Sequence, residues 1–225
     1  MRKKISVSIV LLFIPLVSFS QVQGLSVNLG GKIFKNPTSE TNRILGTPYT
    51  ERKFAYAKIE NVVEKHFMRY NAYSDNFEFI TFRNDTLTID KPDDFSNITF
   101  TNPHKKYSYL NYISKTKGRV KGYLVELYTK GDFSIYKKEA VTYYAGKKAR
   151  TSLETDMYAS YSEVSYFYFF KNKSVNIIPF PDSKKQFIKL YPSKKSEIES
   201  FVKENKISFD EEEDMKKVID FLTTF

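Results

Sequence analysis

Alternation of apolar and polar residues is the feature of this sequence that most restricts its fold. In "NFEFITFR", Phe77 and Phe79 fall on one side of an extended chain and Glu78 falls on the other, because the side chains of a β-strand alternate between two faces. "TLTID" repeats this alternation, and residues 83–86 between the two segments have the Asn/Asp chemistry of a tight turn. The pattern predicts a β-hairpin, with a further strand before it over residues 66–73.

The same period of two continues through most of the chain. Segments such as "KYSYLNYIS", "RVKGYLVELY" and "SEVSYFYFF" alternate and are joined by short turns, which is typical of antiparallel pairing. Twenty Phe and seventeen Tyr suit pleated, half-buried surfaces. We therefore expect a mainly β (α+β) fold. It consists of a single antiparallel sheet of about 8–10 strands, curved or forming an open barrel, closed by about three short C-terminal helices.

Helical periodicity replaces the period of two from about residue 183. Ser183 is the expected cap of the first helix, and Pro192 ends it. In the second helix, Ser196 has the spacing of a capping box with Glu199. Asp210 is the expected cap of the third helix, where further acidic residues complement the helix dipole.

The first twenty residues have the pattern of a secretory signal peptide. Arg2, Lys3 and Lys4 precede an apolar core over residues 5–19, and small side chains before Gln21 predict cleavage after Ser20. The alternative, a membrane-spanning anchor, needs roughly 20 apolar residues, and this core is shorter and interrupted. We expect an exported protein, periplasmic or secreted, that is either free or peripheral at the outer membrane.

Composition narrows the remaining possibilities. The chain has no cysteine, which excludes a lipoprotein anchor, disulfides and zinc–thiolate sites. The predicted organisation is a signal peptide over residues 1–20, an irregular leader over residues 21–52, and one β-rich domain over residues 53–225. The formal net charge of +10 favours acidic partners, although solubility alone explains such a charge equally well.

Few catalytic patterns are present. His66 and His104 lack metal-ligand spacing, and the sequence contains no nucleophile elbow, phosphate loop or dinucleotide fingerprint. We therefore predict no catalytic residue, no metal site and no cofactor. Glu78 and Glu126 are isolated acids in predicted strands, and such residues line a groove in some glycosidases.

Basic and aromatic residues interleave in two places. Lys105 and Lys106 adjoin a tyrosine-rich strand, and Lys147, Lys148 and Arg150 occupy one loop. Tyrosine stacks on sugars and bases, and lysine neutralises phosphates; a solvated sheet face in a lysine-rich protein has the same composition. Export argues against nucleic acid. The candidate contact residues for a ligand or partner are Arg69, Tyr70, Asn71, Tyr73, Tyr107 and Tyr109.

Two stretches resemble a family of uncharacterised exported proteins from Bacteroidetes. They are "LGTPYTERKFAYAKI" with the following "RYNAYSDNFEF", and the tail "KLYPSKKSEIESFVKENKISFDEEEDMKKVIDFL". The resemblance implies an envelope location and a β-rich fold, and no activity. It also implies an O-glycosylation sequon at Asp85–Thr86–Leu87, with Thr86 as the acceptor; the alternative is a β-branched residue that opens a strand.

Three functions remain open at this point. The leading hypothesis is a non-catalytic binding or envelope-associated module, whose partner is an amphipathic ligand, a glycan or an envelope protein. The first alternative is a carboxylate-dependent hydrolase that acts on envelope glycans. The second is a structural partner of an outer-membrane complex.

Overall fold

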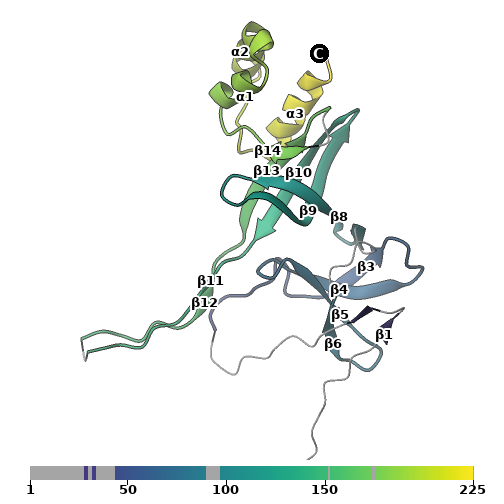
Figure 1. Cartoon of the computed structure of the whole chain (residues 1–225), viewed down its shortest axis with the longest axis vertical. Helices are drawn as coiled ribbons and strands as arrows, with labels where there is room; N and C mark the ends of the chain where they lie inside the picture. Colours follow the sequence, from purple (N-terminus) through teal and green to yellow (C-terminus); the bar gives the residue numbers. More distant parts are fainter. Residues whose placement is uncertain are drawn as a thin grey trace, which may run out of the picture.

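The computed structural model describes residues 44–89, 97–151, 153–173 and 176–224, together with the backbone of two short strands before them. Its main element is a ten-stranded antiparallel sheet that is not closed, and three short α-helices follow near the C-terminus (Figure 1). The fold class predicted from the sequence is therefore confirmed.

The order of strands in the large sheet is β14-β13-β10-β9-β8-β7-β3-β4-β5-β6. The bounds of its strands are β3 Ala55–Ile59, β4 Lys65–Asn71, β5 Asn76–Ile80, β6 Thr86–Thr88, β7 Asn97–Thr101, β8 His104–Ser114, β9 Gly118–Lys130, β10 Phe133–Ala140, β13 Ser165–Lys171 and β14 Ile177–Pro179. Two small sheets pair β1 (Asn28–Leu29) with β2 (Lys32–Ile33) and β11 (Tyr143–Tyr144) with β12 (Ser160–Tyr161).

The predicted hairpin is present as β5 and β6. Phe79 lies opposite Leu87 in the register, and Asn84 in the turn has a φ of 65°, a value that asparagine tolerates better than most residues. Phe77, Phe79 and Leu87 are buried in one core. Burial of alternate side chains thus explains the Phe periodicity of this segment.

The long strands β8 and β9 contribute to cores on both faces of the sheet. Tyr123 and Val125 of β9 belong to the core that β3 to β7 enclose. Leu124 points to the other face, where it packs in a smaller core with Phe169 of β13 and Ile177 of β14. Since β14 also lies beside β8, the second half of the sheet curls around this smaller core.

The helices cover one end of the sheet. They are α1 (Lys184–Leu190), α2 (Lys195–Glu204), preceded by the 3₁₀ turn η2 (Pro192–Lys194), and α3 (Glu212–Leu222). Figure 1 shows them gathered at one end of the molecule, next to β13 and β14, with β3 to β6 at the other end. Their buried side chains pack on Phe133, Ile135 and Phe170 of the sheet.

One of the three predicted helix caps is confirmed. Ser183 caps α1 and accepts a hydrogen bond from the Gln186 backbone N–H at 3.4 Å. The capping box at Ser196 is wrong, because η2 runs directly into α2 and Ser196 is already its second residue. The cap of α3 is Glu211 and not Asp210; the Asp210 carboxylate instead accepts a hydrogen bond from the Ser208 hydroxyl.

Some expectations lie outside the described residues. These are the signal peptide, its cleavage after Ser20, and the part of the leader before residue 44, of which only the backbone of β1 and β2 is described. Within the described part of the chain, none of the helices has the length and apolar character that crossing a membrane requires.

Candidate functional site

Three carboxylates with little exposure lie around the β4–β5 hairpin: Asp75 and Glu139 where it meets β8, β9 and β10, and Glu78 where it meets the segment before β3. Each carboxylate accepts hydrogen bonds from one cation and one tyrosine hydroxyl. We call this set the charged junction. Its members are Asp75 with Lys138 and Tyr70, Glu78 with Arg69 and Tyr49, and Glu139 with Lys105 and Tyr107.

Glu78 is the most completely enclosed of the three, with a side chain that is 3% exposed. Arg69 donates to Glu78 Oε2 from Nε at 2.9 Å and from Nη2 at 2.7 Å. The Tyr49 hydroxyl and the Asn71 amide donate to Oε1, each at 3.2 Å. The Arg69 guanidinium also lies 3.6 Å from the centre of the Tyr49 ring and 4.4 Å from that of Phe54. Both carboxylate oxygens are therefore engaged.

Asp75 joins the β4–β5 turn to the middle of β9 and β10. Its Oδ1 accepts from Lys138 Nζ at 2.5 Å, from the Tyr70 hydroxyl at 2.6 Å and from the Tyr123 backbone N–H at 3.2 Å. Gly122 permits this approach, because a Cβ atom there would lie 2.6 Å from Asp75 Oδ2. The hairpin is thereby held against β9.

Glu139 makes the third set of contacts, with Lys105 Nζ at 2.5 Å and the Tyr107 hydroxyl at 2.6 Å. Burial, followed by the nearby carboxylates, raises the pKa of Tyr70 and Tyr107 well above the ordinary value. Burial and Glu78 raise the pKa of Tyr49 to about 12, despite the opposing effect of Arg69. These hydroxyls remain protonated donors at neutral pH, so none of them serves as a base.

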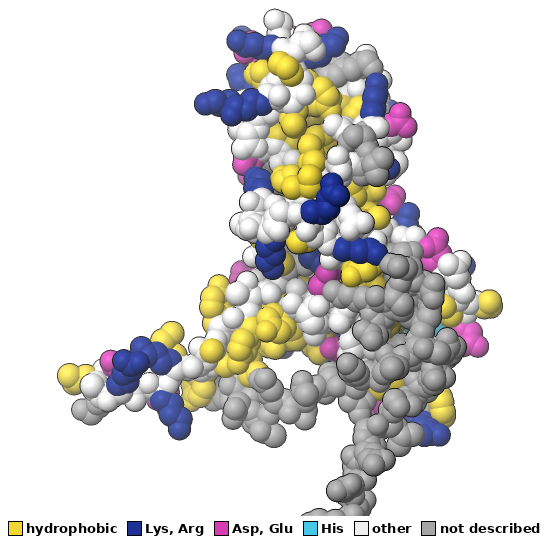
Figure 2. Space-filling model, in the orientation of Figure 1, with side chains coloured by type: hydrophobic (Ala, Val, Ile, Leu, Met, Phe, Trp, Pro, Cys, Tyr) yellow, Lys and Arg dark blue, Asp and Glu magenta, His cyan; other side chains and the backbone are white. Residues whose placement is uncertain are grey.

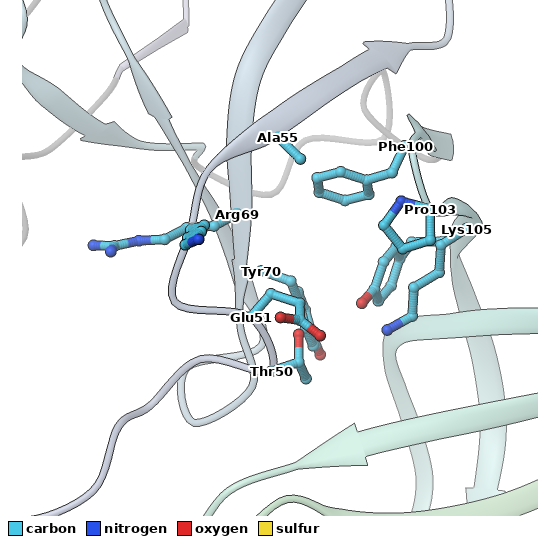
Figure 3. A pocket seen from close by; sticks show the side chains of 10 residues that line it. Thr50, Glu51, Ala55, Arg69, Tyr70, Phe100, Pro103 and Lys105 are labelled. Atoms are coloured by element: carbon cyan, nitrogen blue, oxygen red, sulfur yellow. The ribbon is translucent and has the colours of Figure 1, made fainter.

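A small pocket adjoins the junction (Figure 3). Its volume is about 40 Å³, which is room for a few water molecules. In Figure 3 the Arg69 side chain extends away from the other lining residues. Its guanidinium is held by Glu78, which lies outside the pocket lining. The lining residues are Thr50, Glu51, Lys53, Ala55, Arg69, Tyr70, Phe100, Pro103, Lys105 and Tyr107.

A second candidate surface is the segment that projects from the body at β11 and β12 (Figure 1). We call it the arm and define it as residues 143–151 and 153–161. Tyr143 pairs with Tyr161 at its base, and further out the backbones of Lys147 and Met157 exchange two hydrogen bonds of 2.8 Å. Tyr73 of the body packs on both base tyrosines, with ring centres 6.0 Å from Tyr143 and 5.5 Å from Tyr161.

The outer part of the arm exposes apolar and basic side chains together (Figure 2). Leu153 is 96% exposed and Met157 is 67% exposed. Lys147, Lys148 and Arg150 are exposed too, and none of these three forms an ion pair with another described residue. The nearby acids contact the backbone, with Asp156 accepting from the Ala149 N–H and Glu154 from the Arg150 N–H.

The residues singled out from the sequence fall into different places. Four of the six candidate contact residues, Arg69, Tyr70, Asn71 and Tyr107, belong to the charged junction or donate to it, and Tyr73 lies at the base of the arm. Tyr109 packs on Tyr123 at 4.9 Å, below the Lys121 ammonium. Thr86 opens β6, half-buried.

Sequence reasoning missed the junction partners Tyr49, Asp75, Lys138 and Glu139. The charged run "KKE" inside the apolar strand "FSIYKKEAV" is the signal that points to two of them, because charges at core positions require partners. The other acid considered from the sequence, Glu126, pairs with Lys106 at 2.9 Å. The described residues contain no group of acids and histidines that could hold a metal ion.

Comparison with protein-family models, with curated proteins and with solved structures finds no match to this chain. The resemblance to exported Bacteroidetes proteins and the O-glycosylation of Thr86 therefore stay predictions. The function has to be inferred from the geometry of the junction, the pocket and the arm.

Proposed function

We propose that this protein is a non-catalytic, envelope-associated module that acts by binding another macromolecule through its outer surface. The observation that carries the proposal is the complete pairing of the charged junction: Asp75, Glu78 and Glu139 each already hold a cation and a tyrosine hydroxyl. A general acid or base must reach the proton that it transfers, and these three carboxylates are already held by partners of their own.

The pocket beside the junction also argues against a catalytic function. Hydrolysis of a glycoside needs one carboxyl group as acid and a second as nucleophile or base, with the sugar between them. A volume of about 40 Å³ holds no sugar ring, and Glu78 and Glu126 each have their own cationic partner. The carboxylate-dependent hydrolase is thus the weaker hypothesis.

Both concave faces of the sheet are filled by the protein's own aromatic side chains, so a partner has to bind at the outer surface. The rings of Phe77, Tyr107 and Tyr123 fill the concavity of the first half, and the Phe77 ring centre lies 5.1 Å from that of Tyr107 and 4.8 Å from that of Tyr123. The curled second half is filled in the same way by Tyr112 and Phe169, 4.7 Å apart. An amphipathic ligand therefore has no internal space among these described residues, which favours a macromolecular partner.

The proposal is tested by following the native protein in a mild extract of the cell envelope. We expect it to migrate in a complex larger than the purified chain. Purified protein should release no sugar ends from envelope glycans beyond the amount released by Glu78→Gln and Glu126→Gln variants. Migration as a monomer, together with glycan turnover that either substitution abolishes, would overturn the proposal in favour of the hydrolase.

A further inference from the structure

We infer that the arm is the docking element of this module, and that its partner is a protein with an apolar groove lined by carboxylates. This inference rests on the proposed binding function and names the surface and the chemistry of the partner. Its starting point is the arm in Figure 2, which projects from the body with apolar and basic side chains at its surface.

Apolar exposure on the arm extends along its whole length. Tyr144 near the base is 57% exposed, Tyr158 is 55% exposed and Met157 67%, and Leu153 at the far end is 96% exposed. Clustered exposure of this kind marks interaction surfaces, whereas single exposed apolar residues are ordinary. A groove in another protein can cover all four side chains at once.

The charge of the arm identifies the kind of groove. Lys147, Lys148 and Arg150 lie within four residues of each other without an ion-pair partner among the described residues. Carboxylates on the partner would complement them, which speeds encounter and suppresses wrong partners. The same three cations argue against a second copy of this chain, because pairing two arms would bring like charges together.

A lipid surface fits the arm less well than a protein groove does. A membrane would take up only the far end, and there the acids Glu154 and Asp156 follow Leu153 in the chain. These acids offset part of the attraction that Lys147, Lys148 and Arg150 have for anionic headgroups. The exposed tyrosines nearer the base would remain uncovered, so a membrane accounts for less of the surface.

The base of the arm is fixed in advance of binding. Leu45 donates to the Ala159 carbonyl at 2.9 Å and accepts from the Tyr161 N–H at 2.8 Å. Gly46 passes so closely that a Cβ atom there would lie 2.6 Å from the Tyr161 carbonyl oxygen. Such preorganisation lowers the entropy lost on binding and directs the outer part away from the body.

The test uses the full-length chain in the cells that export it, with a photo-crosslinking amino acid at Leu153. Val63 is the matched site, because it is equally exposed, at 97%, on the body. The same probe at Leu153 is combined with Lys147→Glu, Lys148→Glu and Arg150→Glu. The control variant carries Lys184→Glu, Lys185→Glu and Lys189→Glu on α1, which change the net charge equally at exposed positions far along the chain.

We expect a cross-link from position 153, and not from position 63, to a protein whose cross-linked segment is acidic. The arm reversal should reduce its yield at least about tenfold, since charged groups at a docking site contribute strongly to affinity, and the α1 reversal should leave it unchanged. A cross-link to lipid or to a second copy, equal yield from position 63, no cross-link, or a yield that arm reversal leaves unchanged would each overturn the inference.

The two proposals fail in different ways. If the protein still migrates in a large envelope complex but the arm reversal changes nothing, the arm is not the docking element and the binding function stands. If the protein migrates as a monomer and turns over glycans, the binding function itself is wrong.

Discussion

The charged junction and the arm use the same kinds of residue for opposite purposes. Both combine tyrosine, lysine, arginine and acidic side chains, yet in the junction they are largely removed from water and paired, and in the arm they are exposed, with cations that have no ion-pair partner among the described residues. Asp75 closes the β4–β5 hairpin onto β9 and β10, and Glu78 ties it to the segment before β3, so the charges of the junction serve the fold. The arm contributes few contacts to the body, so its side chains are available to a partner.

Breaking the junction at its most enclosed carboxylate should have the largest effect on stability. We expect Glu78→Ala to lower the free energy of unfolding by up to about 3–5 kcal/mol, because it removes the carboxylate that pairs with the Arg69 charge and accepts from the Asn71 amide. Denaturant unfolding of the purified protein measures this loss.

A paired replacement shows whether the loss comes from the stranded charge. Combining Arg69→Met with Glu78→Leu removes both charges and keeps apolar volume. We expect this variant to be more stable than Glu78→Ala, since apolar replacement of a buried ion pair is often close to neutral. Equal losses in both variants would contradict the account of Glu78 as a buried partner.

Two Tyr→Phe substitutions, each of which removes one hydroxyl group, compare the stability of the junction with that of the arm. Tyr70→Phe removes the hydroxyl that donates to Asp75 at 2.6 Å and accepts from Lys138 at 3.1 Å, and should cost about 1–3 kcal/mol, because two hydrogen bonds to charged groups are lost. Tyr73→Phe, in a residue that is 52% exposed at the base of the arm, should stay within about 0.5 kcal/mol of wild type. Similar melting curves for both variants would show that the junction is not held by its hydroxyls.

The elements that follow from local pattern could be predicted from the sequence. Phe77 and Phe79 alternate with polar residues because they are buried on one face. The turn is predictable because asparagine, as at Asn84, tolerates the positive φ of a tight turn. The cap of α3 was misplaced because Ser208 engages the Asp210 side chain, a contact that local spacing does not reveal.

The junction depends on contacts between distant parts of the chain. Lys138 lies 63 residues after Asp75, and Glu139 lies 32 residues after Tyr107. Strand order and curl decide which of these charges meet, and period-two patterning carries no information about either. For the same reason, the sequence "AGKKARTSLETD" predicts a basic loop but does not show that this loop projects from the body.

Alkaline pH should weaken the junction through Tyr49. Its pKa is about 12 in the folded protein and about 10 in an unfolded chain, so the native state holds its proton longer and stability falls as the pH rises from about 10 toward 12. This one residue contributes a loss of at most about 1.4 kcal/mol per pH unit in that window, because the half-buried hydroxyl is partly screened by water. Unfolding measured across it should give a flatter slope for Tyr49→Phe than for wild type, and parallel slopes would contradict the assignment.

The smallest effect on global stability, and the sharpest separation of the two regions, is expected at Gly146. An alanine there would place its Cβ 2.7 Å from the Ala159 nitrogen and 2.8 Å from the Met157 carbonyl oxygen, so the two sides of the arm must separate. Amide hydrogen exchange should then speed up at Lys147 and Met157, which bond to each other across the arm. The Tyr123 amide, held by Asp75 in the junction, should keep its protection, because local opening of a projecting segment leaves the core closed. Leu153→Ser is the control, since it changes the arm's surface without touching its backbone and should leave all three amides unchanged. Loss of protection at Tyr123 in the Gly146→Ala variant would mean that the arm and the junction open as one unit and that the arm is part of the folded core.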